Sequence, residues 1–261
     1  MQLDRYGPWA LVAGGSEGLG ACFAELLAAD GFDLVLVGRK PEALEETAAR
    51  CRTAGREVRC LAVDLAAPDA AGRVANGCGD LEVGLLVYNA GANAYGSPFV
   101  DGELERFRTV VELNTTSRLA LAHHFGSLMK KRGRGGMLFV GSMAGYRGSP
   151  HNALYNSAKA FGRIFSEGLW YELAPHGVDV VEFVVGAMRT PAMARRGMVF
   201  GPDVADPADV AREGLAHVGD GPVWNSEAAG GDATAVHLNA FPRGPVVAEA
   251  ADSLRALGLY P

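Results

Sequence analysis

Short apolar runs alternate with longer amphipathic stretches along the chain from about residue 9 to residue 185. Each apolar run is rich in Val and Leu and is bounded by Gly or polar residues, a pattern typical of strands buried on both faces. The stretches between the runs have a helical period, and this alternation indicates an α/β fold with a parallel sheet covered by helices. The predicted strands are Trp9–Ala13, Asp33–Gly38, Glu57–Val63, Val83–Asn89, Gly136–Ser142 and Val178–Val185.

The predicted helices lie mostly between these strands, with prolines in first-turn or terminal positions where helices accept them. Between about residues 187 and 206 the regular pattern stops at a segment with several methionines and prolines, which we interpret as a loop or short-helix lid. The predicted helices are Gly18–Asp30, Pro41–Ala54, Glu112–Arg132, Ala153–Pro175, Pro207–His217 and Pro245–Leu257.

No linker, composition shift or fixed repeat divides the 261 residues, so we expect one domain over residues 1–261. The formal net charge of −6, from 24 Lys+Arg and 30 Asp+Glu, argues against a nucleic-acid partner. The chain lacks an apolar run long enough to cross a bilayer, and we expect a cytoplasmic protein with no membrane partner. Its four cysteines have no C-x-x-C spacing, so we predict reduced thiols and no metal site.

A glycine-rich turn, AGGSEGLG at positions 13–20, joins the first predicted strand to the first long helix. Glycines let the backbone approach a pyrophosphate, and the N–H groups at a helix N-terminus attract its charge. The glycines at 14, 18 and 20 do not follow the G-x-G-x-x-G spacing of many dinucleotide-binding folds. Taken alone, the turn is therefore also compatible with an ordinary tight connection.

A tyrosine and a lysine, Tyr155 and Lys159, are four residues apart near the start of a predicted helix. This spacing places the phenol and the ammonium on one helix face, although such a pair is usually part of an ordinary amphipathic surface. A nearby cation lowers the pKa of a phenol toward the range in which it exchanges a proton with a hydroxyl or carbonyl. Ser142 ends a predicted strand, where ligands bind in open α/β sheets, and this favours a catalytic interpretation.

Five motifs, taken in their order along the chain, resemble those of the single-domain short-chain dehydrogenase/reductase family. They are the glycine turn, NAG at positions 89–91, Asn114, Ser142, and Tyr155 with Lys159. The resemblance implies a Rossmann-type, doubly wound, mostly parallel sheet of about seven strands with helices on both faces. It also implies a nicotinamide cofactor and hydride transfer at a carbon that bears a hydroxyl or a carbonyl.

The resemblance, which covers about residues 7–191, implies a role for each catalytic residue. Tyr155 would be the general acid/base, and Ser142 would hydrogen-bond the substrate oxygen. Lys159 would lower the Tyr155 pKa and hold the nicotinamide ribose, while Asn114 would anchor a water in a proton relay. A relative that only senses the cofactor would be expected to lack the tyrosine or the lysine, so we expect an active enzyme.

The resemblance further assigns cofactor contacts to the glycine turn, to the ends of the third and fourth strands, and to the stretch after the sixth strand. Three departures from the family pattern, Ala13 for Thr, Val185 for Pro and Ser157-Ala158 for Ala-Ser, remove no catalytic group. The residues implied to contact the cofactor are Gly14, Ser16, Gly18, Leu19, Gly20, Asp64, Leu65, Asn89, Gly91, Tyr155, Lys159, Gly186, Met188 and Thr190.

The end of the second strand bears on the choice of nicotinamide cofactor. An acid for the ribose 2′-hydroxyl is absent there, and Arg39 with Lys40 can instead pair with a 2′-phosphate. Glu17 argues the other way, since NADP-using relatives often have a basic residue at that position. We favour NADP(H), with NAD as the alternative if Arg39 and Lys40 are solvated surface charges.

The substrate pocket is expected between Ser142 and Tyr155, in the sequence MAGYRGSPHN, and beside residues 92–95. Methionines in the lid adapt to irregular apolar ligands, which favours a hydrophobic ketone or alcohol, although they are equally compatible with a core. The sequence also gives a hint of the 3-ketoacyl and 17β-hydroxysteroid reductase branch. The lid and pocket residues concerned are Ala92, Asn93, Tyr95, Met188, Met193, Met198 and Phe200.

Assembly and activity each leave alternatives open. The family resemblance implies a homodimer or homotetramer, and an apolar stripe on the helix predicted over Ala153–Pro175 would supply the interface or else cover the sheet. Two other functions remain: a regulatory or scaffold protein that binds NAD(P) without turnover, and an epimerase or dehydratase that regenerates its cofactor in each cycle. The stripe consists of Phe161, Ile164, Phe165, Leu169 and Trp170.

Overall fold

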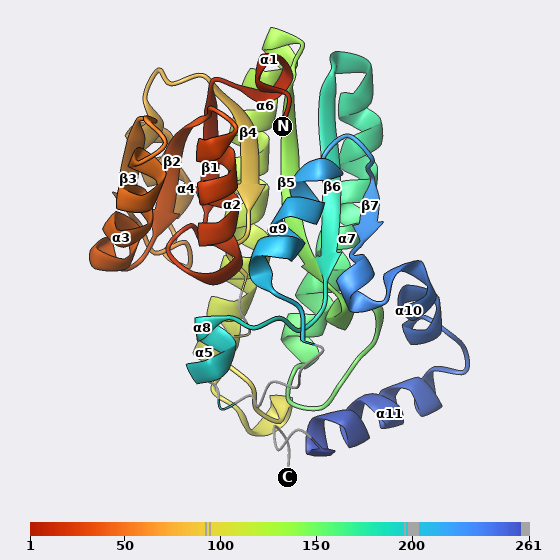
Figure 1. Ribbon diagram of the computed structural model, residues 1–261. Helices are drawn as coiled ribbons and strands as arrows, with labels where there is room; N and C mark the ends of the chain where they lie inside the picture. Colours follow the sequence, from red (N-terminus) through yellow and green to blue (C-terminus); the bar gives the residue numbers. More distant parts are fainter. Residues whose placement is uncertain (92, 94, 196, 198–203, 257–261) are drawn as a thin grey trace.

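The computed structural model describes residues 1–91, 93, 95–195, 197 and 204–256. A seven-stranded sheet in the order β3-β2-β1-β4-β5-β6-β7 runs through its centre (Figure 1). All neighbouring strands are parallel, so the sheet is wholly rather than mostly parallel, and its order is Rossmann-type. The strands are β1 Trp9–Ala13, β2 Asp33–Gly38, β3 Val58–Ala62, β4 Val83–Tyr88, β5 Gly135–Ser142, β6 Val178–Val185 and β7 Val223–Asn225.

Helices cover both faces of this sheet (Figure 1). The sheet requires them because its central strands are buried throughout. The helices are α1 Leu3–Tyr6, α2 Gly18–Ala29, α3 Pro41–Arg52, α4 Ala70–Cys78, α5 Leu104–Val111, α6 Ser117–Arg132, α7 Ala153–Leu173, α8 Pro191–Arg195, α9 Pro207–Ala216, α10 Gly231–Leu238 and α11 Arg243–Ala256.

The two faces of the sheet have separate cores, as β1 illustrates. Ala10 and Val12 pack on one side with α2, α3 and α9, while Leu11 and Ala13 pack on the other with α4, α6 and α7. Successive side chains of a strand point to opposite faces, so one short apolar run supplies both cores. The carboxyl ends of the strands are thereby fixed at a common edge.

A buried ion pair fixes α6 and α7 against β6. Arg118 and Glu182 are 2% and 0% exposed, and two guanidinium N–H groups of Arg118 donate to the Glu182 carboxylate. Arg118 also donates to the Gly162 carbonyl at 3.0 Å, and the Ser166 hydroxyl donates to Glu182 at 2.9 Å. Because partners surround both charges, the pair avoids the large penalty of an unpaired buried ion.

The structure corrects several sequence-based element boundaries. The helix predicted over Glu112–Arg132 is preceded by α5, and a π-helical turn at Glu112–Thr116 separates α5 from α6. The elements α4, α10 and β7 were not predicted, and β7 has only three half-buried residues. The last predicted helix corresponds to α11, and its final residue, Leu257, lies outside the described residues.

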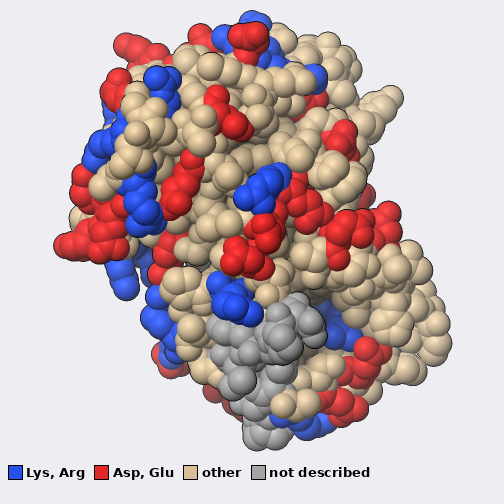
Figure 2. Space-filling view, viewed as in Figure 1, with Lys and Arg blue, Asp and Glu red and all other residues tan. Residues whose placement is uncertain are grey.

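The surface charges and the cysteines of the described residues do not point to a further ligand. Figure 2 shows Lys and Arg side chains interspersed with Asp and Glu over one face of the molecule. No described helix is long and apolar enough to span a bilayer, and the described residues hold no cluster of three metal-ligating side chains. All four cysteines are free thiols, and burial raises the pKa of Cys51 and Cys78 to about 11.

Candidate active site

The glycine turn after β1 folds back so closely that side chains would not fit. A Cβ at position 20 would lie 1.9 Å from the Gly14 carbonyl oxygen, and Gly14 itself has φ +84° beside the backbone of Ala90. Glycine is the residue that accepts both the left-handed backbone and the close approach. The turn therefore exposes main chain rather than side chains at the start of α2, a cradle that suits a pyrophosphate.

Asn89, directly after β4, ties this turn to the centre of the sheet. Its side-chain Nδ2 donates to the Gly14 carbonyl at 2.9 Å, and its main-chain N–H donates to the Ala13 carbonyl at 2.9 Å. The family resemblance led us to expect a threonine at position 13, whose hydroxyl would connect these segments. Here Asn89 and the main chain provide that connection, so the substitution by Ala13 leaves the turn anchored.

Lys159 lies buried beneath the loop that follows β4. Its Nζ is 5.7 Å from the centre of the Tyr155 ring and donates to the Val140 carbonyl at 2.9 Å. A Cβ at Gly91 would meet this Nζ at 2.7 Å and the Asn114 Oδ1 at 2.8 Å. The structure thus brings Tyr155, Lys159, Asn114 and Gly91 together from three separate segments.

Burial sets the charge state of Lys159. Removal from water lowers the pKa of its ammonium to about 8, while Glu182 raises this pKa and Arg118 lowers it further. The cation nearest the Tyr155 ring is thus an ammonium that loses its proton more readily than an exposed lysine does. Such a strongly perturbed group at the carboxyl edge of a sheet is a common feature of catalytic sites.

The π-helical turn orients Asn114 toward Lys159. The side-chain Nδ2 of Asn114 donates to the Val110 carbonyl at 2.9 Å, and the Tyr88 hydroxyl anchors the turn by donating to the Leu113 carbonyl at 2.7 Å. A π turn inserts an extra residue into a helix and redirects the side chains within it. The sequence pattern predicted one regular helix here and did not reveal this turn.

Ser142 ends β5 and begins the segment that we call the wall, residues 143–152. The Ser142 Oγ accepts a hydrogen bond from the Ala144 N–H at 3.2 Å. Asn156 of α7 holds the middle of the wall by donating to the Arg147 carbonyl at 2.7 Å and to the Ser149 hydroxyl at 2.9 Å. Ser142 and Tyr155 therefore stand at opposite ends of one well-anchored segment.

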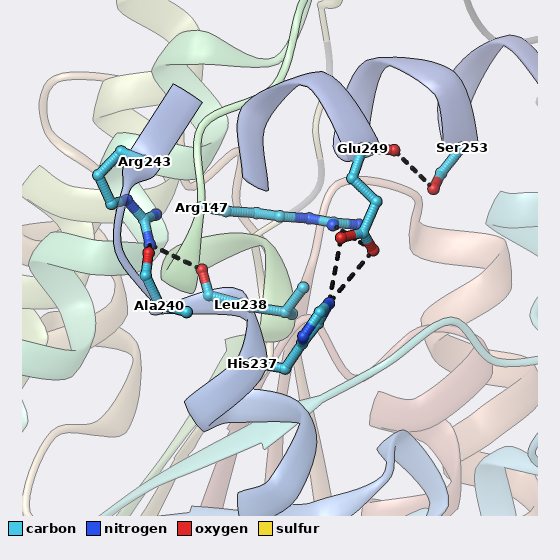
Figure 3. A network of polar contacts seen from close by, with 7 residues as sticks. All are labelled: Arg147, His237, Leu238, Ala240, Arg243, Glu249 and Ser253. Carbon is cyan, nitrogen blue, oxygen red and sulfur yellow. Dashed lines mark hydrogen bonds and ion pairs between the residues drawn. The ribbon is translucent and has the colours of Figure 1, made fainter. Parts of the chain in front are cut away.

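The C-terminal helices hold the wall from outside, which sequence patterns did not predict. The carboxylate of Glu249 on α11 lies 3.4 Å from a guanidinium nitrogen of Arg147 and 3.1 Å from the Nε2 of His237 on α10 (Figure 3). Arg243 donates to the Tyr146 carbonyl at 2.7 Å. The position of the wall thus depends on residues about a hundred positions further along the chain.

A cavity of about 600 Å³ lies between the wall, α7 and α11. Arg147, Asn156, Ala160 and Val247 are among the residues that line it, whereas Ser142 and Tyr155 are not. Despite its size, we therefore do not assign this cavity to the acid–base site.

A second, smaller pocket lies beside the glycine turn. It is lined by Ser16, Glu17, Arg39 and Lys40, and by Arg195 at the end of α8. Arg39 and Lys40, the two basic residues that the sequence analysis placed at the cofactor, thus line one pocket. Arg195 was not among the predicted site residues, because no local pattern links it to a turn that lies 178 positions earlier.

The remaining predicted contacts divide into exposed and buried groups. Thr190 lies against the glycine turn, with its Cγ2 3.2 Å from where a Cβ of Gly18 would be. Asp64 is exposed after β3. The side chains of Leu19, Leu65 and Met188 are buried in the cores, so these side chains are not available to a ligand.

The pocket residues predicted in the lid and after β4 are only partly described. Asn93 donates to the side chain of Asn152 in the wall, and the ring of Tyr95 lies 4.9 Å from that of Phe107. Met188 packs in the core, in line with the core interpretation of that methionine. Ala92, Met198 and Phe200 lie outside the described residues.

A parallel sheet in this order, with a glycine turn after β1, is the arrangement of a Rossmann-type dinucleotide-binding fold. The short chain dehydrogenase family model matches residues 8–198. The chain therefore belongs to the short-chain dehydrogenase family.

Several members of this family resemble the chain over most of its length. It is 34% identical over 220 residues to a 7β-hydroxysteroid dehydrogenase of Clostridium sardiniense, covering 83% of this chain and 84% of that protein. It is 37% identical over 196 residues to a very-long-chain 3-oxoacyl-CoA reductase of Podospora anserina, covering 73% of this chain and 57% of the reductase.

Solved structures agree with this assignment. A structure from work on 7β-hydroxysteroid dehydrogenase stereoselectivity superposes with a TM-score of 0.80 at 29% identity, covering 85% of this chain and 88% of the other. A short-chain dehydrogenase from Sphingobium yanoikuyae in complex with NADPH gives a TM-score of 0.75 at 33% identity, with coverage of 81% and 84%.

Proposed function

We propose that the protein is an NADP(H)-dependent oxidoreductase that interconverts a ketone and a secondary alcohol on a bulky, hydrophobic substrate. The observation that carries this proposal is the convergence of Tyr155, Lys159, Asn114 and Gly91 at the edge where Ser142 ends β5. The relatives named for hydroxysteroids and very-long-chain 3-oxoacyl-CoA support the substrate class.

In the proposed mechanism, Tyr155 is the general acid/base. During reduction its phenol gives a proton to the carbonyl oxygen, and during oxidation the phenolate takes the proton from the alcohol. Ser142 donates a hydrogen bond to the same oxygen, where negative charge develops. The Lys159 ammonium stabilises the phenolate, and Asn114 links Lys159 to a proton relay. A bound nicotinamide would supply or accept the hydride.

The main chain of the glycine turn would hold the cofactor pyrophosphate at the start of α2. Because Gly91 has no side chain, the β4 loop can lie directly against Lys159 and Asn114. The exposed main chain of the glycine turn fits the pyrophosphate of a dinucleotide. Thr190 against Gly18 would place the stretch Gly186–Thr190 beside the nicotinamide end. Asp64 and the main chain of Leu65 would lie at the adenine end.

We assign NADP(H) as the cofactor because Arg39 and Lys40 meet at one pocket and suit a 2′-phosphate. The solved relative that binds NADPH supports this assignment. If both side chains only interact with water, NAD is the alternative, and comparison of the dissociation constants of NADPH and NADH distinguishes the two cases.

Replacement of Tyr155 by Phe tests the enzymatic function. We expect turnover of a panel of bulky ketones to fall by about 10²- to 10⁴-fold, because the proton donor is lost. The affinity for NADPH, measured by quenching of tryptophan fluorescence, should stay close to that of the wild type. Tyr171→Phe is the matched control, since Tyr171 is on the same helix and is 76% exposed.

The outcomes separate the proposed function from its alternatives. Full activity of the Tyr155→Phe variant would contradict the assigned mechanism. NADPH binding by the wild type without turnover of any ketone would favour the regulatory function, and product formation without net NADPH consumption would favour an internal redox reaction.

We also propose a homodimer or homotetramer formed through the outer face of α7. Phe161 and Ile164 are 41% and 57% exposed there, whereas Phe165, Leu169 and Trp170 pack against the core and cover the sheet. The predicted stripe is therefore divided between the outer face of α7 and the face that packs on the sheet. Measurement of the molar mass in solution for the wild type and for Ile164→Glu tests this interface.

Two further proposals concern the organisation of the chain. Residues 1–261 are assigned to one domain, and the segment 187–206, which includes α8, is assigned as the lid over the substrate. A cytoplasmic location stays a prediction from the sequence.

A further inference from the structure

The small pocket beside the glycine turn combines three cations with one anion. Arg39, Lys40 and Arg195 line it together with Glu17. The proposed function places the 2′-phosphate of NADP(H) here, and the present inference rests on that proposal. A carboxylate at such a site would repel the phosphate, so Glu17 needs an explanation.

Glu17 and Arg195 form a two-point ion pair across this pocket. The Nη1 of Arg195 donates to Glu17 Oε2 at 2.9 Å, and its Nη2 donates to Oε1. Glu17 precedes α2 but its carboxylate does not cap the helix. These hydrogen bonds hold the pKa of Glu17 below its usual range, and Lys40 and Arg39 act in the same direction.

The pair connects two segments that are far apart in the sequence. Figure 1 shows α8 at the same edge of the sheet as the turn between β1 and α2. Both side chains are partly exposed, at 55% for Arg195 and 40% for Glu17, so a ligand can reach the pocket beside them. Because bidentate pairing with a guanidinium balances a carboxylate in charge and in hydrogen bonds, Glu17 then contributes little net charge.

We infer that Arg195 determines the cofactor preference by neutralising Glu17. With the pair formed, the charges of Arg39 and Lys40 act on the 2′-phosphate without opposition from the carboxylate. Without Arg195, the carboxylate of Glu17 repels the phosphate.

A purely structural role of Arg195 predicts a different result. If the ion pair only docked α8 on the glycine turn, its loss would weaken NADPH and NADH equally, because both cofactors share the pyrophosphate and the nicotinamide. A selective effect on NADPH therefore separates charge neutralisation from docking.

The experiment measures the dissociation constants of NADPH and NADH by quenching of tryptophan fluorescence, on the full chain and without substrate. The variants are Arg195→Gln, Glu17→Gln and the double variant. Arg212→Gln is the matched control, since Arg212 forms an exposed ion pair with Asp209 on α9, away from the pocket.

We expect Arg195→Gln to weaken NADPH by about fivefold, the size of a surface charge interaction, and to leave NADH within about twofold of the wild type. The double variant should regain NADPH affinity to within about twofold of the wild type, because no carboxylate remains to be neutralised.

Three results would overturn the inference: equal weakening of both cofactors in Arg195→Gln, no change in either, or a double variant that binds NADPH as weakly as Arg195→Gln. The wild-type titration separately tests the proposed function. If the wild type binds neither cofactor, or binds NADH more tightly than NADPH, the proposed function itself fails.

Discussion

In the half of the site formed by the glycine turn and Asn89, the main chain leaves no space for a Cβ at Gly14 or Gly20. In the wall, by contrast, side chains of α10 and α11 hold the backbone from outside through Arg243 and Glu249. The Cβ position of Gly20 lies 1.9 Å from a carbonyl oxygen, whereas that of Gly148 in the wall has its nearest neighbour at 3.8 Å. Gly20 is therefore constrained by sterics, whereas Gly148 has space for a side chain; elsewhere in the wall, a Cβ at Gly145 would meet the main chain of Lys159 at 2.9 Å.

The largest expected effect is that of a methyl group added in the glycine turn, and the same change in the wall is its control. Gly20→Ala places a Cβ against the main chain, so we expect it to lower the free energy of unfolding by about 3 kcal/mol and to abolish NADPH binding. Gly148→Ala should change stability by less than about 0.5 kcal/mol. Urea unfolding and NADPH titration of both variants test this contrast, and wild-type NADPH binding by Gly20→Ala would disprove the steric account.

Lys159 lies where the two halves meet, and its burial has an energetic cost. Lys159→Met should raise the free energy of unfolding near neutral pH by about 2 kcal/mol, since it removes the cost of a buried ammonium but also the hydrogen bond to Val140. The same variant should lose activity. Opposite effects on stability and activity would mark Lys159 as a residue retained for function.

The pH dependence of this effect follows from the lowered pKa of Lys159. The pKa of Lys159 is about 8 in the folded protein and 10.5 ordinarily. At a pH between these two values, Lys159 is protonated in the unfolded chain and deprotonated in the folded chain. The wild type therefore gains stability as the pH rises through this window, and the advantage of Lys159→Met shrinks. Urea unfolding of both proteins at about pH 7 and about pH 10 measures the change, and a constant difference would contradict it.

The smallest effect is expected from the ion pairs that hold the wall. Glu249→Gln removes the charge that faces Arg147 and His237, and the free energy of unfolding should fall by less than about 1 kcal/mol because these pairs are partly exposed. The KM for a ketone should rise by about twofold while the NADPH affinity stays unchanged.

Asp252→Asn is the control for this prediction, since Asp252 pairs with Arg255 on the same helix and forms no ion pair with the wall. Weaker NADPH binding by Glu249→Gln would show that the two halves of the site are coupled rather than separate.

Local patterns of the sequence were enough to predict much of the sheet and the helix that carries Tyr155 and Lys159. The bounds of β1, β2 and β6 agree with the structure because strands buried on both faces are continuous apolar runs between polar or glycine residues. The spacing of Tyr155 and Lys159 likewise predicted their common helix face, because helical geometry is local.

Tertiary structure alone decided the features that join distant segments. The ion pair between Glu17 and Arg195 links positions 178 residues apart, and Arg147 meets Glu249 across 102 residues. The π-helical turn at Asn114 and the short strand β7 also depend on what packs against them, and neither has a period of its own in the sequence. Hydrophobic periodicity reports which face of an element is buried, whereas the partner across a pocket is set by how the whole chain folds.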